Sequence, residues 1–437
     1  MRPTGETSLL VYPATPLPRG AAGFELAPAL VLIGSVGFNA GLAFFNAHIA
    51  PVPTALVIVT EAALVSTAMG LALLAWRPQM APSLALMAAL ALFAVFRGLL
   101  MAAPDPKLLR DVILIPTFMM LGMASDDRQL ARTVIALHTI VFAVFLLEAL
   151  APQAYSDLLR IQDYYIKTRG NKLDEFYNTN SELFISATRP NERFFSFVDA
   201  PRMSSIFLEP VSLGNYCSIV TVFVCSCFRR LGTAGVAYLT LTTAAMLVGC
   251  DGRLATATCA LIIVACIIAT WLPPRSAVLY LPATLAFVFA LVIGADLKPG
   301  SDDFPGRLAH TVKLLMSYDV PEILGLSNEF IFKAMDSGVA YLITTQSLPG
   351  LLLIWAYIGW GAREDTAEQV RFTHGLSLYL ALSMMVSYSF LTIKTGALLW
   401  FIQGTLQAAS LRSVNRRFLN ADERKILAPR EDSSWAR

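Results

Sequence analysis

Long runs of apolar residues, separated by shorter polar stretches, dominate this chain. Many of these runs hold about 20 residues, which as a helix is enough to cross about 30 Å of hydrocarbon. The pattern predicts an all-α polytopic membrane protein with about twelve transmembrane helices. We expect these spans at residues 27–46, 53–76, 84–102, 109–124, 131–151, 206–228, 232–249, 254–272, 278–295, 339–360, 376–393 and 396–411.

Polar stretches divide the chain into tails, groups of spans and two long connections. The divisions are a tail (1–26), spans 1–5 (27–151), a first connection (152–205), spans 6–9 (206–295), a second connection (296–338), spans 10–12 (339–411) and a basic tail (412–437). Lys and Arg near span ends are retained in the cytoplasm, and most of them fall on the side of the two tails. We therefore expect both termini in the cytoplasm and both long connections on the opposite face.

Composition supports a membrane protein and adds few candidate ligands. Hydrophobic residues make up 56% of the chain and charged residues 15%, compared with about 25% charge in soluble domains. The net charge of +2 gives no reason to propose nucleic acid as a partner. The six cysteines lie in or beside apolar spans without metal-ligand spacing, so we interpret them as small core residues and expect neither a disulfide framework nor a metal site.

The first connection combines aromatic rings, including Tyr164 and Tyr165, with many charged side chains. Such a mixture suits sugar binding and equally suits a helix at the membrane interface. Where the chain re-enters the bilayer it carries Arg202 and Glu209, and charge at that depth is costly unless it is paired or used. Arginine matches phosphate oxygens and a carboxylate could accept a hydroxyl proton, although the two could also pair with each other or with lipid headgroups.

Two further basic side chains are expected on the same face as the two long connections. Arg253 follows a turn at Gly252, where an isolated arginine could simply extend to the headgroups. Arg307 lies in the second connection, one helical turn before His310. A histidine with a near-neutral pKa could accept a hydroxyl proton, and it could equally be a solvated surface residue.

Glu61 and His138 fall inside predicted spans. An ionisable group within the bilayer is either functional or part of a polar contact between helices. We interpret both as structural contacts, because a neutral, hydrogen-bonded carboxyl can also join two helices.

The order of several short motifs resembles the bacterial O-antigen ligase and polymerase superfamily, particularly the Wzy-type exopolysaccharide polymerases. The motifs are Arg202 followed by Phe207-Leu208-Glu209-Pro210, Gly252-Arg253, Gly306-Arg307, and Asp336-Ser337-Gly338 before a span that contains Gly350. The chain departs from the family at Thr311, where relatives often have tryptophan, and at Glu209, where ligases tend to have histidine. The second difference weakens the ligase interpretation.

This resemblance implies a GT-C-like membrane glycosyltransferase in the bacterial inner membrane. It would join undecaprenyl-diphosphate-linked oligosaccharide repeat units into an exopolysaccharide or O-antigen at the periplasmic face, without a cofactor. The implied site has Arg202, Arg253 and Arg307 on the donor diphosphate, His310 or Glu209 as the base, and Tyr164, Tyr165 and Asp336 near the substrate. A flippase and a chain-length regulator are the implied partners. An O-antigen ligase that uses a lipid A-core acceptor, or a polysaccharide or lipid transporter, are the alternatives.

Overall fold

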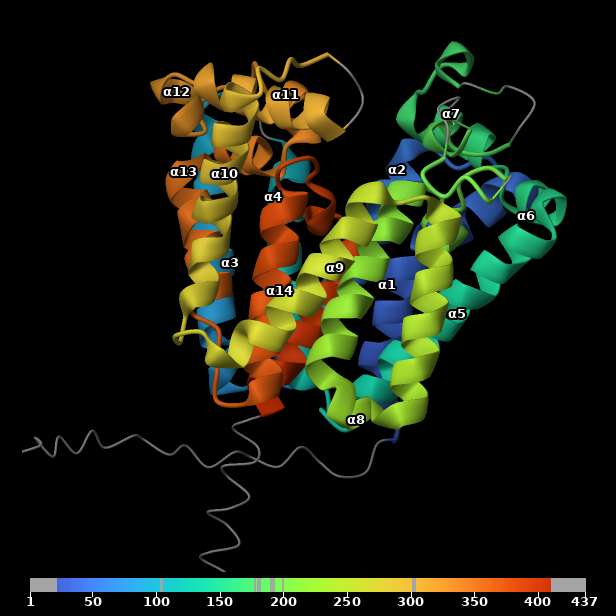
Figure 1. Cartoon of the computed structure of the whole chain (residues 1–437), viewed down its shortest axis with the longest axis horizontal. Coiled ribbons are helices and arrows are strands. Elements are labelled where there is room, and N and C mark those ends of the chain that lie inside the picture. The colour runs from blue at the N-terminus through green and yellow to red at the C-terminus, as the bar shows by residue number, and fades with distance from the viewer. Residues whose placement is uncertain are drawn as a thin grey trace, which may run out of the picture.

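The computed structural model describes residues 22–102, 105–176, 178, 182–188, 193–198, 200–300 and 304–409. Within these ranges the chain forms helices and no strand, in agreement with the predicted all-α class (Figure 1). Of the two predicted tails, residues 1–21 and 412–437 lie outside the described residues.

The helices fall into two groups that are separated by the first long connection. The N-terminal group comprises α1 (Ala22–His48), α2 (Thr54–Leu74), α3 (Ala81–Leu100), α4 (Pro106–Ala124) and α5 (Leu130–Leu150). The C-terminal group comprises α8 (Pro210–Cys250), α9 (Arg253–Ile268), α10 (Tyr280–Gly294), α13 (Gly338–Gly359), α14 (Ala367–Ser383) and a helix at 393–409. The first connection contains α6 (Pro152–Leu159) and α7 (Ile161–Arg169), and the second contains α11 (Phe304–Met316) and α12 (Val320–Ile323).

Eight helices of the described chain are long and apolar enough to cross a membrane, namely α1, α2, α3, α5, α8, α9, α10 and α13. Three of the predicted spans lie outside these eight helices. The span at 109–124 corresponds to α4, which carries Lys107, Arg110 and Asp111 in its first two turns. The other two cover α14 and the helix at 393–409. The single span predicted at 376–393 is wrong, because α14 ends at Ser383 and the next helix begins ten residues later.

The long helix α8 is a hairpin of two arms. Helical geometry breaks at Cys227 and Gly232. Gly232 has a φ of 65°, a backbone angle that residues other than glycine rarely adopt. A Cβ built on Gly214 would lie 3.8 Å from Cys250 Sγ, whereas a straight helix would separate these residues by about 54 Å. The arms therefore lie side by side (Figure 1), and they correspond to the spans predicted at 206–228 and 232–249.

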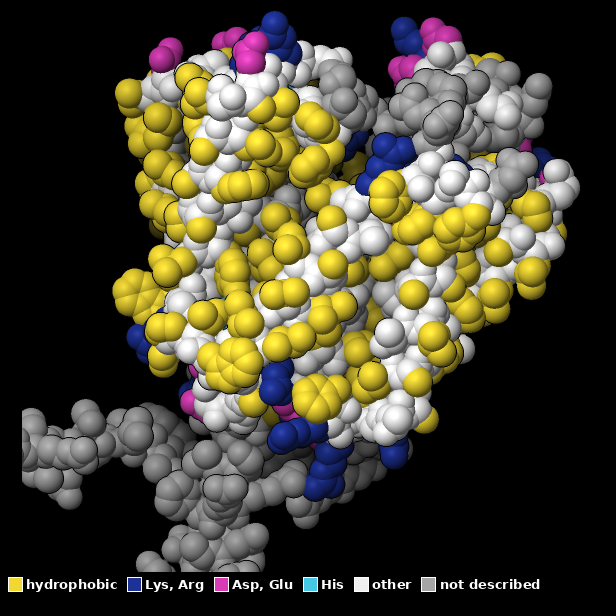
Figure 2. All heavy atoms as spheres, in the orientation of Figure 1, with side chains coloured by type: hydrophobic (Ala, Val, Ile, Leu, Met, Phe, Trp, Pro, Cys, Tyr) yellow, Lys and Arg dark blue, Asp and Glu magenta, His cyan; other side chains and the backbone are white. Residues whose placement is uncertain are grey.

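Both long connections lie at the same end of the helical bundle (Figure 1). Asn46 Nδ2, near the end of α1, donates to Asp163 of α7 at 2.8 Å, so α1 begins at the opposite end. The helical body has an apolar surface with charged side chains mainly at its two ends (Figure 2). Leu74, Leu92 and Leu241 are each at least 70% exposed on outward faces, as expected where lipid rather than water surrounds the helices.

The two ionisable side chains noted within the predicted spans join helices to one another. His138 of α5 is fully buried, with Nδ1 3.1 Å from Tyr216 Oη and Nε2 2.7 Å from Thr242 Oγ1, one on each arm of α8. Glu61 of α2 accepts a hydrogen bond of 2.7 Å from Arg110 of α4. Glu61 is thus part of an ion pair between helices, whereas the sequence suggested a neutral carboxyl.

Candidate functional site

A cavity of about 710 Å³ lies at the end of the bundle that carries the two connections. Its wall is built from the N-terminal parts of α8, α9 and α11, the C-terminal part of α14 with the residues that follow it, and parts of the first connection. The charged and polar lining residues are Arg169, Ser186, Arg202, Glu209, Asn215, Ser218, Asp251, Arg253, Thr258, Arg307, Tyr379, Ser383 and Ser387. Segments that are far apart in sequence therefore contribute to one site.

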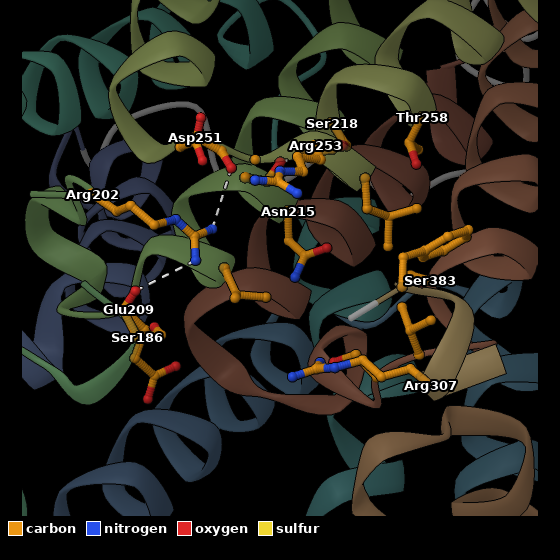
Figure 3. Close-up of a pocket in the computed structure, with 18 of the residues that line it drawn as sticks. Ser186, Arg202, Glu209, Asn215, Ser218, Asp251, Arg253, Thr258, Arg307 and Ser383 are labelled. Carbon is orange, nitrogen blue, oxygen red and sulfur yellow. Dashed lines mark hydrogen bonds between the residues drawn. The ribbon is translucent and has the colours of Figure 1, made fainter. Parts of the chain in front are cut away.

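The three arginines singled out from the sequence line this one cavity. In Figure 3, Arg202, Arg253 and Arg307 lie on different sides of the cavity, with Asn215 between them. Arg253 is the first residue of α9, and Arg307 lies in the first turn of α11. Arg253 and Arg307 therefore each lie at the beginning of a helix, and the later residues of that helix pack against its neighbours. This keeps both side chains at the end of the bundle where the cavity lies.

The guanidinium of Arg202 is oriented by backbone carbonyl groups. Nε donates to the carbonyl of Cys250 at 3.0 Å, and the two terminal nitrogens approach the carbonyls of Ser186 and Asp251 at 3.4 Å each (Figure 3). These three acceptors are carbonyl oxygens, and together they fix the direction of the side chain. The contacts with Cys250 and Asp251 also tie Arg202 to the turn that carries Arg253.

The turn between α8 and α9 is itself tightly held. Asp251 adopts a left-handed conformation with a φ of 50°, and its carboxylate accepts hydrogen bonds from the backbone N–H groups of Phe194 and Phe195 at 3.2 and 3.0 Å. At Gly252, an added Cβ would lie 3.2 Å from both Cys250 Sγ and Ala255 Cβ. The turn therefore anchors part of the first connection against the bundle.

Glu209 has two cationic partners at the cavity wall. Its Oε1 lies 2.6 Å from Arg169 and accepts a hydrogen bond of 3.1 Å from the hydroxyl of Tyr165. Its Oε2 lies 2.5 Å from Lys394 Nζ and 2.9 Å from Ser212 Oγ. Although burial opposes ionisation, the two cations dominate and hold the pKa of Glu209 far below its usual range. A carboxylate stabilised in this way is a weak proton acceptor.

Two cations at this site were missed from the sequence. Arg169 is one of many charged residues in the first connection, and only its position one turn after Tyr165 hinted at a stacked pair. In the structure its guanidinium carbon lies 4.2 Å from the centre of the Tyr165 ring. Lys394 lies between the spans predicted at 376–393 and 396–411, and a lone lysine beside an apolar run gives no indication of its partner.

Four other residues considered from the sequence do not line the cavity. Tyr164 and Tyr165 are each 1% exposed, so they lie behind its wall, and Tyr164 donates to Asn39 Oδ1 at 3.0 Å. His310 Nε2 lies 2.8 Å from the carbonyl oxygen of Lys333. Asp336 is exposed and ends a short 3-10 helix, Lys333–Asp336. Contact between these side chains and a ligand inside the cavity would require rearrangement.

The lining residues favour an anionic ligand. Four arginines and two carboxylates are among the described residues that line the cavity, so cationic side chains outnumber anionic ones in its lining. Arginine forms paired, charge-assisted hydrogen bonds with phosphate oxygens. Comparison of the chain with protein-family models, with curated proteins and with solved structures gives no significant match. Functional interpretation therefore depends on the chemistry of this cavity and on the motifs in the sequence.

Proposed function

We propose that this chain is a glycosyltransferase that joins undecaprenyl-diphosphate-linked oligosaccharide repeat units into a polysaccharide at the periplasmic face of the bacterial inner membrane. The observation that carries the proposal is the convergence of Arg169, Arg202, Arg253 and Arg307 on one cavity. The same cavity lies at one end of an apolar helical bundle, where the headgroup of a membrane lipid would lie.

Charge and depth both support a lipid diphosphate as the ligand. A diphosphate that links a lipid to a sugar carries about two negative charges, which would balance the excess positive charge of the cavity. The lipid chain would remain among apolar helix faces while the glycan extends away from the bilayer. A soluble sugar nucleotide would have no need for a site at this depth.

In the proposed reaction, a hydroxyl oxygen of the acceptor glycan attacks the anomeric carbon of the donor. The new carbon–oxygen bond forms as the bond from that carbon to the diphosphate breaks, and undecaprenyl diphosphate departs with the electron pair. The arginines would stabilise the charge that develops on this leaving group. The hydroxyl proton passes to a base. Glu209 is held as a weakly basic carboxylate, which leaves His310 as the candidate, and His310 would have to move towards the cavity to accept the proton.

The proposal is tested with purified protein and a synthetic lipid-linked repeat unit in detergent. Wild-type protein should extend the repeat unit into longer chains, and R202A and R253A should reduce extension by at least about a hundredfold, as when charge stabilisation is removed from other active sites. K172Q is the matched control, because Lys172 is an exposed cation of the same connection that does not line the cavity. Normal chain length and yield from both arginine variants would contradict the proposal.

A deletion strain distinguishes the polymerase from the ligase that uses the same donor. Single unpolymerised repeat units should accumulate when the gene is removed, because units would still be made and flipped but not joined. Accumulation of full-length lipid-linked chains would instead indicate a ligase.

A further inference from the structure

Arg169 is held at the cavity wall from two directions. It is the last residue of α7, and its terminal nitrogen lies 2.6 Å from Glu209 Oε1 while its guanidinium covers the Tyr165 ring. The side chain is nevertheless 47% exposed and lines the cavity. The guanidinium is therefore fixed by the protein and still accessible to a ligand.

Glu209 alone would neutralise the charge of Arg169. Lys394 adds a second positive charge beside Glu209. Lys394 Nζ lies 2.5 Å from the second carboxylate oxygen, and the lysine side chain is only 6% exposed. The group of three thus holds two cations and one anion. Because Lys394 is buried and does not line the cavity, the remaining positive charge is presented to a ligand through Arg169.

This arrangement resembles that of Arg202 in its effect, although the contacts differ. Arg202 is oriented by neutral carbonyl oxygens, and Arg169 is oriented by a carboxylate whose charge is offset by a lysine. In both cases the side chain is ordered before the ligand arrives, so binding loses less side-chain entropy. Because Arg169 is the last residue of α7, its contact with Glu209 also holds the first connection against the cavity. Arg253 and Arg307 lie in other segments and cannot do this.

We propose that Glu209 and Lys394 are positioning residues that hold the guanidinium of Arg169 at the cavity wall, where Arg169 binds the diphosphate of the substrate. This inference rests on the proposed function for the identity of the anion. It assigns a fourth arginine to the diphosphate and gives Glu209 a positioning role instead of that of the base.

The test measures the binding of farnesyl diphosphate to the purified full-length protein in detergent by microscale thermophoresis. R169Q should weaken binding by about tenfold or more, because a charge-assisted hydrogen bond is lost. The double variant E209Q/K394M removes both buried charges together, so neither is left unpaired, and it should weaken binding severalfold. K172Q should bind like the wild type, and thermal unfolding of each variant checks that it is folded.

The positioning role predicts that these effects are not independent. If Glu209 and Lys394 act through Arg169, the triple variant R169Q/E209Q/K394M should bind as weakly as R169Q alone. Effects that multiply, or unchanged binding by E209Q/K394M, would overturn the positioning role, and unchanged binding by R169Q would overturn the contact with the diphosphate. Each of these three results would leave the proposed function intact. If the wild type bound farnesyl diphosphate no more tightly than R202A/R253A, both the proposed function and this inference would be overturned.

Discussion

Lys394 Nζ lies 2.5 Å from Glu209 Oε2, and this ion pair joins the beginning of the helix at 393–409 to the beginning of α8. Both side chains are shielded, with 6% and 15% of their surfaces exposed. Ion pairs at such depth contribute little when complete, but removal of one partner leaves a costly unpaired charge. The stability of the cavity wall therefore depends on keeping both charges or removing both.

Lys394→Met should destabilise the protein by about 1.5–3 kcal/mol, because Glu209 keeps Arg169 on one oxygen but loses the charge-assisted hydrogen bond on the other. E209Q/K394M should be closer to the wild type, since it leaves no isolated charge in this pair. Thermal unfolding in detergent, followed by circular dichroism, measures both variants. A single variant as stable as the double variant would contradict the coupling between these side chains.

Stability should depend on pH through Glu209. Its pKa is lowered in the folded protein, so its stabilising contribution is present above the unfolded pKa of about 4.3 and is lost as the pH falls towards the folded pKa. We expect the melting temperature of the wild type to fall more steeply below about pH 4 than that of E209Q/K394M. Parallel curves for the two proteins would show that this carboxylate is not the source.

Arg97→Gln should loosen the second connection. Arg97 is 2% exposed in α3 and donates to the carbonyls of Gly325 and Ser327 at 2.6 and 3.1 Å, and to Asn328 Oδ1 at 2.6 Å. Loss of hydrogen bonds from a charged donor costs about 1.5–3 kcal/mol each. Limited proteolysis should cut residues 317–333 faster in the variant. Arg363→Gln is the control, because Arg363 is exposed in the segment between α13 and α14, which lies at the opposite end of the bundle (Figure 1).

His310→Ala tests the remaining candidate for the base. If His310 accepts the hydroxyl proton, the turnover of lipid-linked repeat units should fall by about 10²- to 10⁴-fold. Binding of farnesyl diphosphate should change by less than about twofold, because the histidine does not line the cavity. Turnover that stays within a few fold of the wild type would exclude His310 from this role.

The proposed orientation in the membrane predicts opposite labelling at the two ends of the bundle. Lys172→Cys and Asp365→Cys each place a thiol at an exposed position, the first beside α7 and the second just before α14. In intact spheroplasts a membrane-impermeant maleimide should label K172C and leave D365C unlabelled until the membrane is opened. Labelling of D365C alone would reverse the proposed topology.

The helical class and most spans could be predicted because hydrophobic run length reports directly on helix length in a bilayer. Arg202 and Arg253 could be singled out for a related reason, since each stands at the end of an apolar run, whereas Arg307 was singled out by the Gly306-Arg307 motif in the second connection. The prediction failed at residues 384–392, where a mostly apolar sequence leaves the helix between α14 and the helix at 393–409. Hydropathy measures whether a side chain prefers an apolar or an aqueous environment, and it does not detect a break in the backbone of a helix.

The convergence of the cavity residues could not be predicted, because it depends on packing between distant segments. Arg169, Glu209 and Lys394 are separated by 40 and 185 residues along the chain, and each looks unremarkable in its own segment. They form one group only because Arg169 and Lys394 both pair with Glu209. The sequence placed Tyr165 near a ligand, whereas its ring supports Arg169 from behind the cavity wall.

The turn at 250–253 performs three tasks with four consecutive residues. Its carbonyls orient Arg202, its carboxylate holds the backbone at Phe194 and Phe195, and its last residue is Arg253. An insertion or deletion of one residue here would displace two arginines and a loop at once. We therefore expect homologues to keep the length of this turn constant while its surroundings diverge, and to retain or lose Arg202 and Arg253 together.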